Sequence, residues 1–267
     1  MHVFNFLLFY PIFMSIYWIV GSIYYFFIKE KPFNRSLLVK SEHQQVEGIS
    51  FLLACYNESE TVQDTLSSVL SLEYPEKEII IINDGSSDNT AEIIYDFKKN
   101  HDFKFVDLEV NRGKANALNE GIKQASYEYV MCLDADTVID DDAPFYMIED
   151  FKKNPKLGAV TGNPRIRNKS SILGKIQTIE YASIIGCIKR SQSLAGAINT
   201  ISGVFTLFKK SALKDVGYWD TDMITEDIAV SWKLHLFDYE IKYEPRALCW
   251  MLVPETIGGL WKQRVRW

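Results

Sequence analysis

The sequence predicts an α/β fold with a mostly parallel β-sheet, preceded by one membrane-spanning helix. From residue 49 onward, short and uniformly apolar runs alternate with stretches of helical periodicity, which is typical of a parallel sheet covered on both faces. Residues 3–28 contain no charged side chain and, at the rise of an α-helix, are long enough to cross a bilayer. Polar clusters follow four successive predicted strands, and this regularity indicates one shared cleft.

The uncharged segment 3–28 is predicted to be a membrane helix rather than a signal peptide or a buried core helix. It lacks the basic start and small-residue cleavage site of a signal peptide, and a core helix rarely stays uncharged for so long. Lys29, Lys31 and Arg35 follow it directly, so the positive-inside rule places the next domain in the cytoplasm. The sequence therefore predicts a protein of the cell membrane whose following domain lies in the cytoplasm.

The rest of the chain divides into a polar, unpatterned linker at 29–48 and one domain at 49–267. The predicted strands of its first half are 49–54, 78–83, 103–109 and 129–133. The stretches between them are amphipathic, and these apolar residues share helical faces: Val62, Leu66, Val69 and Leu70, then Ile93, Ile94 and Phe97, then Ala117, Leu118 and Ile122. The later half is less regular, with a long helix at 171–190, strands near 200–208 and 240–244, and a helix beginning around Glu226.

Charge and cysteine content exclude several classes of function. The formal net charge of −6 argues against a nucleic-acid-binding protein, which usually has a basic surface. The four cysteines are scattered and show no CxxC spacing, which argues against a disulfide framework or a zinc site and favours a reducing compartment.

Two carboxylates, Asp134 and Asp136, end the apolar strand "YVMCL". On an extended strand end, residues i and i+2 face the same side, so both would point into the cleft. Two carboxylates so close together favour a divalent cation, and hard oxygen ligands favour Mg²⁺ or Mn²⁺. A solvated turn or a helix N-cap is the alternative, but the other polar strand ends favour the metal site.

Asp84 and Lys114 are candidate contacts to a nucleotide. Asp84 lies in "IINDGSSD", where it could form a turn or accept hydrogen bonds from a nucleobase edge. This segment is not a GxGxxG fingerprint, so a dinucleotide cofactor is not implied. Lys114, in "RGKANALN" at a predicted helix start, is either a solvent-exposed lysine or a phosphate partner.

Two further segments have a structural and a catalytic interpretation. Asp227, in "ITEDIAV", could favour a helix N-terminus or act as a general base if it faces the cleft. The segment "GGLWKQRVRW" could be a surface amphipathic helix. Alternatively, the arginines Arg264 and Arg266 could bind a diphosphate, and a tryptophan could face a sugar ring.

The ordered motifs "CYNE", "NDGSSD", "GKANALN", "DAD", "TED" and "QRVRW" resemble the processive family 2 glycosyltransferases with a GT-A fold. Cellulose, hyaluronan and chitin synthases belong to this group. Segments such as "TGNPRIRNKSSILGKIQTIEY" are most similar to the members that polymerise β-1,6-linked N-acetylglucosamine for bacterial biofilms. The resemblance covers essentially the whole chain, and although "DAD" alone is weak, the ordered set is specific.

The resemblance implies a role for each motif. It assigns these residues to the uridine pocket: Ala54, Tyr56, Glu58 and Asp84. It makes Asp134 and Asp136 the metal-binding pair on the sugar-nucleotide diphosphate, and Asp227 the general base. It places the last motif at the diphosphate and the acceptor, with the residues Gln263, Arg264, Arg266 and Trp267.

The implied reaction is inverting transfer of N-acetylglucosamine from UDP-N-acetylglucosamine to a growing glycan acceptor. A small membrane partner subunit is also expected. Family members continue past the last motif with further membrane helices, so the chain, which stops at Trp267, is expected to be an N-terminal portion. The alternatives are another UDP-sugar polysaccharide synthase of the hyaluronan or cellulose type, or a non-catalytic module of a synthase complex.

Overall fold

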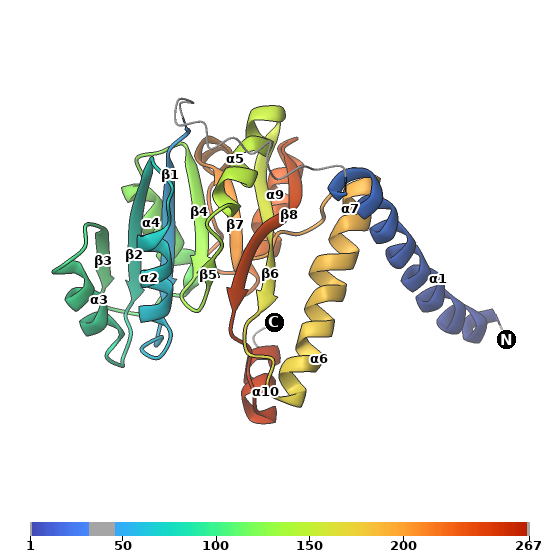
Figure 1. The fold of residues 1–267 in the computed structure, drawn as a ribbon, viewed down its shortest axis with the longest axis horizontal. Helices are drawn as coiled ribbons and strands as arrows, with labels where there is room; N and C mark the ends of the chain where they lie inside the picture. Colours follow the sequence, from blue (N-terminus) through green and yellow to red (C-terminus); the bar gives the residue numbers. More distant parts are fainter. Residues whose placement is uncertain (1, 32–45, 266–267) are drawn as a thin grey trace.

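The computed structural model of the chain describes residues 2–31 and 46–265 (Figure 1). Most of the predicted linker, and the predicted site residues Arg266 and Trp267, lie outside the described residues. The strands are β1 (Ile49–Cys55), β2 (Lys77–Asp84), β3 (Lys104–Leu108), β4 (Tyr129–Asp134), β5 (Val138–Ile139), β6 (Leu157–Ile166), β7 (Phe205–Lys209) and β8 (Glu240–Met251). They form one sheet in the order β3-β2-β1-β4-β7-β6-β8-β5.

The first four strands in this order are parallel, as predicted, and β7 joins β4 in the antiparallel direction. The strands predicted in the first half are confirmed to within a residue or two. The prediction missed β5 and β6, and the strand expected near 200–208 begins only at Phe205 because a turn precedes it. The resulting sheet is mixed and mostly parallel along its N-terminal half.

Helices cover both faces of the sheet, as the uniformly apolar strands predict (Figure 1). The helices are α1 (His2–Tyr25), α2 (Val62–Ser71), α3 (Thr90–Lys98), α4 (Lys114–Gln124), α5 (Ala143–Lys153), α6 (Ile172–Tyr181), α7 (Lys189–Ala195), α8 (Lys210–Asp215), α9 (Glu226–Leu236) and α10 (Ile257–Val265). Phe51 and Leu53 pack in a core cluster with α2, α3 and α5, whereas Leu52 packs in a second cluster with α4, α8 and α9. The alternating side chains of one strand thus supply both cores.

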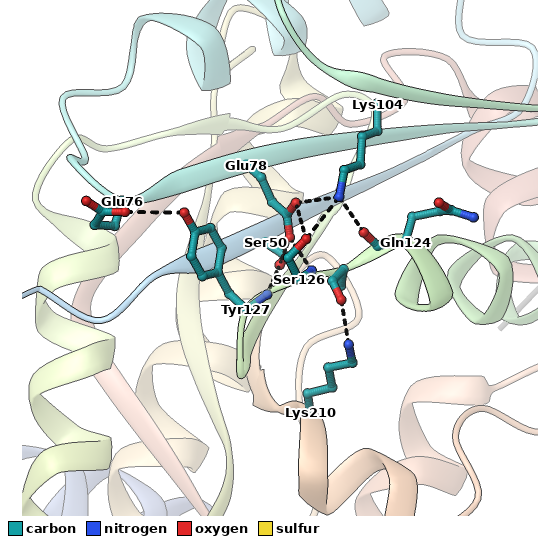
Figure 2. A network of polar contacts seen from close by, with 9 residues as sticks. Ser50, Glu76, Glu78, Lys104, Gln124, Ser126, Tyr127 and Lys210 are labelled. Atoms are coloured by element: carbon teal, nitrogen blue, oxygen red, sulfur yellow. Dashed lines mark hydrogen bonds and ion pairs between the residues drawn. The ribbon is translucent and has the colours of Figure 1, made fainter.

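The amino ends of the strands are joined by a polar network centred on Glu78 (Figure 2). Its carboxylate accepts hydrogen bonds from Ser50 Oγ (2.5 Å), Ser126 N (2.5 Å) and Lys104 Nζ (2.7 Å). Burial acts to raise the pKa of Glu78, but the hydrogen bonds from Lys104, Ser50 and Ser126 outweigh it and hold the pKa at about 2. This network ties β1 and β2 to β3 and to the turn before β4, and it leaves the carboxyl ends of the strands for the site.

The helix α1 continues as a π-helical segment, η1 (Phe26–Glu30). Among the described residues, one helix, within residues 6–30, is long and apolar enough to cross a membrane by length and composition. The predicted long helix at 171–190 is also present: it runs through α6, a π-helical segment η3 (Ala182–Ile188) and α7.

The membrane-helix candidate packs against α7 near its carboxyl end, and the rest of the helix projects away from the domain (Figure 1). Ser191 Oγ donates to the carbonyl of Trp18 at 2.7 Å, and a Cβ on Gly21 would lie 2.5 Å from that hydroxyl. Nearer the end of the first helical segment, Arg190 pairs with both carboxylate oxygens of Glu30 at 2.5 and 3.1 Å. Small side chains and one bidentate ion pair therefore dock α1 and η1 on the domain.

Candidate active site

Loops after β1 and β2 meet at the carboxyl edge of the sheet. Asn57 adopts a left-handed conformation (φ 54°), which lets its backbone N–H donate to Ser86 Oγ at 3.0 Å. In return, Ser87 N donates to Asn57 Oδ1 at 2.8 Å. Asparagine tolerates this conformation better than most residues. The two loops thus form one wall of the predicted cleft.

The residues expected to form the uridine pocket lie on or beside this wall. Ala54 pairs with Asp134 in the register of β1 and β4, so it adjoins the first metal candidate. Tyr56 is 47% exposed at the start of the loop. Glu58 is half-buried and its Oε2 accepts a hydrogen bond from Thr61 Oγ1 at 2.7 Å.

Asp84 is buried at the end of β2 and holds the third loop in place. Its two oxygens accept backbone N–H groups of Arg112 (3.0 Å) and Gly113 (2.8 Å). Gly85 has a φ of 63°, and a Cβ there would lie 2.5 Å from the backbone nitrogen of Asn111. Glycine is therefore required for the close approach of the third loop, and Asp84 fixes the N-terminus of α4.

Lys114, the first residue of α4, links the strand end to α9. Its ammonium pairs with Asp134 and lies 3.7 Å from Glu226 Oε1. Burial acts to lower the pKa of Lys114, but Asp134 and Glu226 outweigh it and hold the pKa above its usual value. In this structure the predicted phosphate partner thus neutralises a carboxylate of the site.

Asp134 and Asp136 lie close together, though not on an extended strand end. The strand β4 ends at Asp134, and Thr137 N donates to its carbonyl at 3.1 Å to form a turn. Thr65 Oγ1 donates to the carbonyl of Ala135 at 2.7 Å and holds the turn against α2. The prediction that both residues sit on an extended segment is therefore wrong, because the turn begins one residue earlier.

The electrostatics of this pair suit a divalent cation. Burial, then Asp134 and Glu58, raise the pKa of Asp136 to about 7. Among the described residues, no group of three or more histidine, cysteine or acidic side chains is placed to hold a metal ion. Mg²⁺ and Mn²⁺ in nucleotide sites use one or two carboxylates and complete their coordination with substrate phosphates. The donor set fits that arrangement.

Gly203, in the turn before β7, connects the carboxylate pair to Asp227. Its carbonyl accepts from Lys114 Nζ at 3.0 Å, and its N–H donates to Asp227 Oδ2 at 3.2 Å. Asp227 Oδ1 also accepts from Ile228 N at 2.9 Å, in the first turn of α9. A Cβ on Gly203 would lie 3.1 Å from Asp227 Oδ2, so this close contact favours glycine. Asp227 is thus both a helix-start residue and a neighbour of the cleft.

The last motif is described only in part. Gln263 and Arg264 are half-buried on α10, and Arg264 Nη2 pairs with Glu180 of α6 at 2.5 Å. Burial, Asp136 and Asp134 raise the pKa of Tyr181 to about 12, while Arg264 opposes them. Tyr181, at the end of α6, thus lies within electrostatic reach of both Arg264 and the carboxylate pair.

The sequence did not identify Gly203 or Tyr181 as part of the site. It also did not identify Glu226 as a partner of Lys114. Glu226 stood beside the predicted base in "TED", so its acidic side chain was a usable signal. Gly203 and Tyr181 lie within apolar stretches, and only the folded arrangement brings them to the carboxylates.

Comparisons with known proteins identify the family of the chain. Residues 50–217 match the family described as glycosyl transferase family 2. A poly-beta-1,6-N-acetyl-D-glucosamine synthase of Staphylococcus epidermidis is 99% identical over the whole chain, and one of Staphylococcus aureus (strain COL) is 78% identical. The chain spans 65% of the length of each of these curated relatives.

Solved structures share the fold at low sequence identity. The mannosyltransferase PcManGT from Pyrobaculum calidifontis, in complex with GDP-Man and Mn²⁺, aligns with a TM-score of 0.68 at 21% identity. That alignment covers 95% of this chain and 70% of the mannosyltransferase. S. aureus TarS 1-349 in complex with UDP-GlcNAc aligns with a TM-score of 0.58 at 18% identity, over 78% of this chain and 59% of TarS. With a family match that covers most of the sheet and the carboxylate pair at its edge, the chain belongs to glycosyltransferase family 2.

Proposed function

We propose that the protein is the catalytic part of a membrane-anchored, inverting N-acetylglucosaminyltransferase. It would transfer N-acetylglucosamine from UDP-N-acetylglucosamine to a growing β-1,6-linked glycan of the biofilm matrix. The observation that carries this proposal is Gly203, whose carbonyl accepts from Lys114 and whose N–H donates to Asp227. It links the carboxylate pair of a nucleotide-sugar site to a candidate base. The names of the relatives supply the identity of the sugar.

Asp134 and Asp136 are the residues that would hold Mg²⁺ or Mn²⁺. The cation would supply a positive charge that bridges the carboxylates and the donor diphosphate, and it would stabilise the charge that grows on the departing UDP. Lys114 pairs with Asp134 in the structure. When the donor binds, Lys114 is proposed to pair with a phosphate oxygen instead. Gln263 and Arg264, with Arg266 and Trp267, are proposed to bind the diphosphate and the acceptor end.

Asp227 is proposed to remove the proton from the acceptor hydroxyl. As the hydroxyl oxygen attacks the anomeric carbon, the bond from that carbon to the UDP oxygen breaks and UDP leaves with the electron pair. A single displacement converts the α-linked donor into a β-linkage through an oxocarbenium-like transition state. The N–H groups of Gly203 and Ile228 orient the Asp227 carboxylate for this step.

Residues 3–28 are proposed to span the membrane, with 29–48 as the linker and 49–267 as the cytoplasmic transferase domain. The length and apolar composition of the first helix support the anchor. Apolar side chains on α6 and α10 are also exposed, which fits a domain held close to a membrane: Ile172, Ile176, Ile179, Ile257, Trp261 and Val265. A small membrane partner subunit completes the proposal.

The test uses a full-length protein that carries this sequence followed by the remaining part of its S. epidermidis relative. Membranes containing it should consume UDP-N-acetylglucosamine and release UDP, and EDTA should abolish the reaction until Mg²⁺ or Mn²⁺ is restored. Asp134→Ala and Asp136→Ala should each abolish turnover without preventing folding. Equal use of UDP-glucose or UDP-glucuronic acid would contradict the proposed sugar, and donor binding without turnover would favour a non-catalytic module.

A further inference from the structure

A buried lysine, Lys189, lies near the proposed base and holds the segment that contacts it. Lys189, the first residue of α7, is 4% exposed, and its ammonium donates to the carbonyl of Thr200. Burial lowers the pKa of Lys189 to about 8, and the Asp227 carboxylate opposes that effect. A buried ammonium is costly to keep unless it serves a partner, so its position needs an explanation.

The segment that Lys189 holds is the one that contacts Asp227. Residues 200–203 run between α7 and α9. Ile201 N donates to Ser231 Oγ at 3.0 Å, and that hydroxyl donates to the carbonyl of Asp227 at 2.6 Å. Two residues later, Gly203 N donates to the Asp227 side chain at 3.2 Å. The segment therefore contacts the carboxylate of the proposed base directly and reaches its backbone through Ser231.

We propose that Lys189 is a positioning residue for Asp227. By holding the Thr200 carbonyl, it fixes the segment whose Gly203 N–H donates to the Asp227 carboxylate. The inference rests on the proposed function, since it assigns a supporting residue to the same base. It differs from the role of Lys114, which contacts Asp134 and Gly203 O from the cleft side.

A purely structural lysine would behave differently when replaced. Lys77 offers the comparison, because its ammonium donates to the carbonyls of Val69 (3.2 Å), Leu70 (2.9 Å) and Leu72 (2.5 Å), at the amino end of the sheet. Burial lowers its pKa as well. Lys77→Met removes three lysine–carbonyl bonds, more than the one to Thr200 that Lys189 makes, without touching the segment 200–203.

The experiment compares Lys189→Met, Lys189→Arg and Lys77→Met in the full-length protein, with melting temperature, kcat, and KM for UDP-N-acetylglucosamine measured for each. For Lys189→Met we expect kcat to fall about tenfold to a hundredfold, the range that a misplaced catalytic group produces, while KM stays within about threefold. Lys189→Arg, which keeps the charge and the donor, should recover much of kcat. Lys77→Met should lower the melting temperature and leave kcat unchanged.

An inactive parent protein would overturn the proposed function and this inference with it. If the parent is active, a Lys189→Met kcat within about twofold of the parent would overturn the inference alone, because that is far below the expected misplacement effect. So would a loss that appears only in KM, or one that Lys77→Met reproduces. Should Lys189→Met fail to fold, Lys189→Gln, which is polar and uncharged, takes its place with the same expected results.

Discussion

Replacing Asp227 by asparagine separates its helix-start role from its proposed role as a base. Both carboxylate oxygens are used, Oδ1 by Ile228 N and Oδ2 by Gly203 N. An asparagine has one carbonyl oxygen, so one of these two hydrogen bonds is lost. The expected cost is about 1 kcal/mol in the free energy of unfolding. In a domain of this size that corresponds to a fall of roughly 2–4 °C in melting temperature.

The expected effect on the reaction is much larger than this stability cost. Loss of a general base slows the chemical step by about a hundredfold or more, or roughly 2.7 kcal/mol in the activation free energy. The assay is N-acetylglucosamine incorporation by membranes with the full-length protein, alongside calorimetric titration of UDP with Mn²⁺. Donor binding should stay close to that of the parent, because Asp227 is proposed to act on the acceptor.

Glu226→Gln is the matched control for Asp227→Asn. It removes the neighbouring carboxylate, which lies 3.7 Å from Lys114 Nζ, but leaves both hydrogen bonds of Asp227 intact. We expect a milder loss of activity. If Asp227→Asn retains more than about a tenth of the parent rate, Asp227 is not the general base, because loss of a general base lowers the rate about a hundredfold or more. The base would then lie elsewhere, and Asp227 would keep only its role at the start of α9.

Three further perturbations test other parts of the structure. Glu78→Ala should lower the free energy of unfolding by about 1–2 kcal/mol at pH 7. Because the folded pKa of Glu78 is about 2, below its ordinary 4.5, denaturant titrations should show this difference in full above pH 4.5 and shrinking as the pH falls toward 2. Gly203→Ala should reduce turnover more than melting temperature, since its Cβ would press on Asp227 Oδ2 from 3.1 Å; normal turnover would contradict the close contact. Glu30→Gln and Arg190→Met should destabilise non-additively in a double-mutant cycle, by about 1 kcal/mol of coupling, and strict additivity would argue against the ion pair.

The sequence predicted the first half of the fold well because each strand there is a continuous apolar run that ends in a polar loop. It missed β6, "LGAVTGNPRI", because Thr161 and Asn163 interrupt the apolar pattern. Both are buried, and their polar groups are used: Ser202 N donates to Thr161 Oγ1, and Asn163 Nδ2 donates to the carbonyl of Pro245. Those partners lie far away in the chain, so no local sequence pattern predicts these hydrogen bonds.

The candidate site was predictable where chemistry is concentrated in short motifs, as at Asp134 and Asp136. The sequence did not reveal how these residues are held. Asp84 was interpreted as a nucleobase contact or a turn residue, and the structure shows its oxygens accepting the N–H groups of Arg112 and Gly113. The sequence does not predict the burial of Lys189, because a lysine in a long helix usually faces solvent. Its burial arises only when α7 packs against the segment 200–203.

Because α1 docks on α7, a short series of contacts connects the proposed membrane helix to the proposed base. Glu30 pairs with Arg190, and the next residue toward the amino end of α7 is Lys189, which holds the segment against Asp227. A helix whose apolar length differs from the local bilayer thickness adjusts by tilting. Through the ion pair of Glu30 with Arg190, tilting of α1 would be transmitted to α7. Under the proposed function, we expect the rate of glycan synthesis by the full-length protein to depend on the acyl-chain length of the lipids around it.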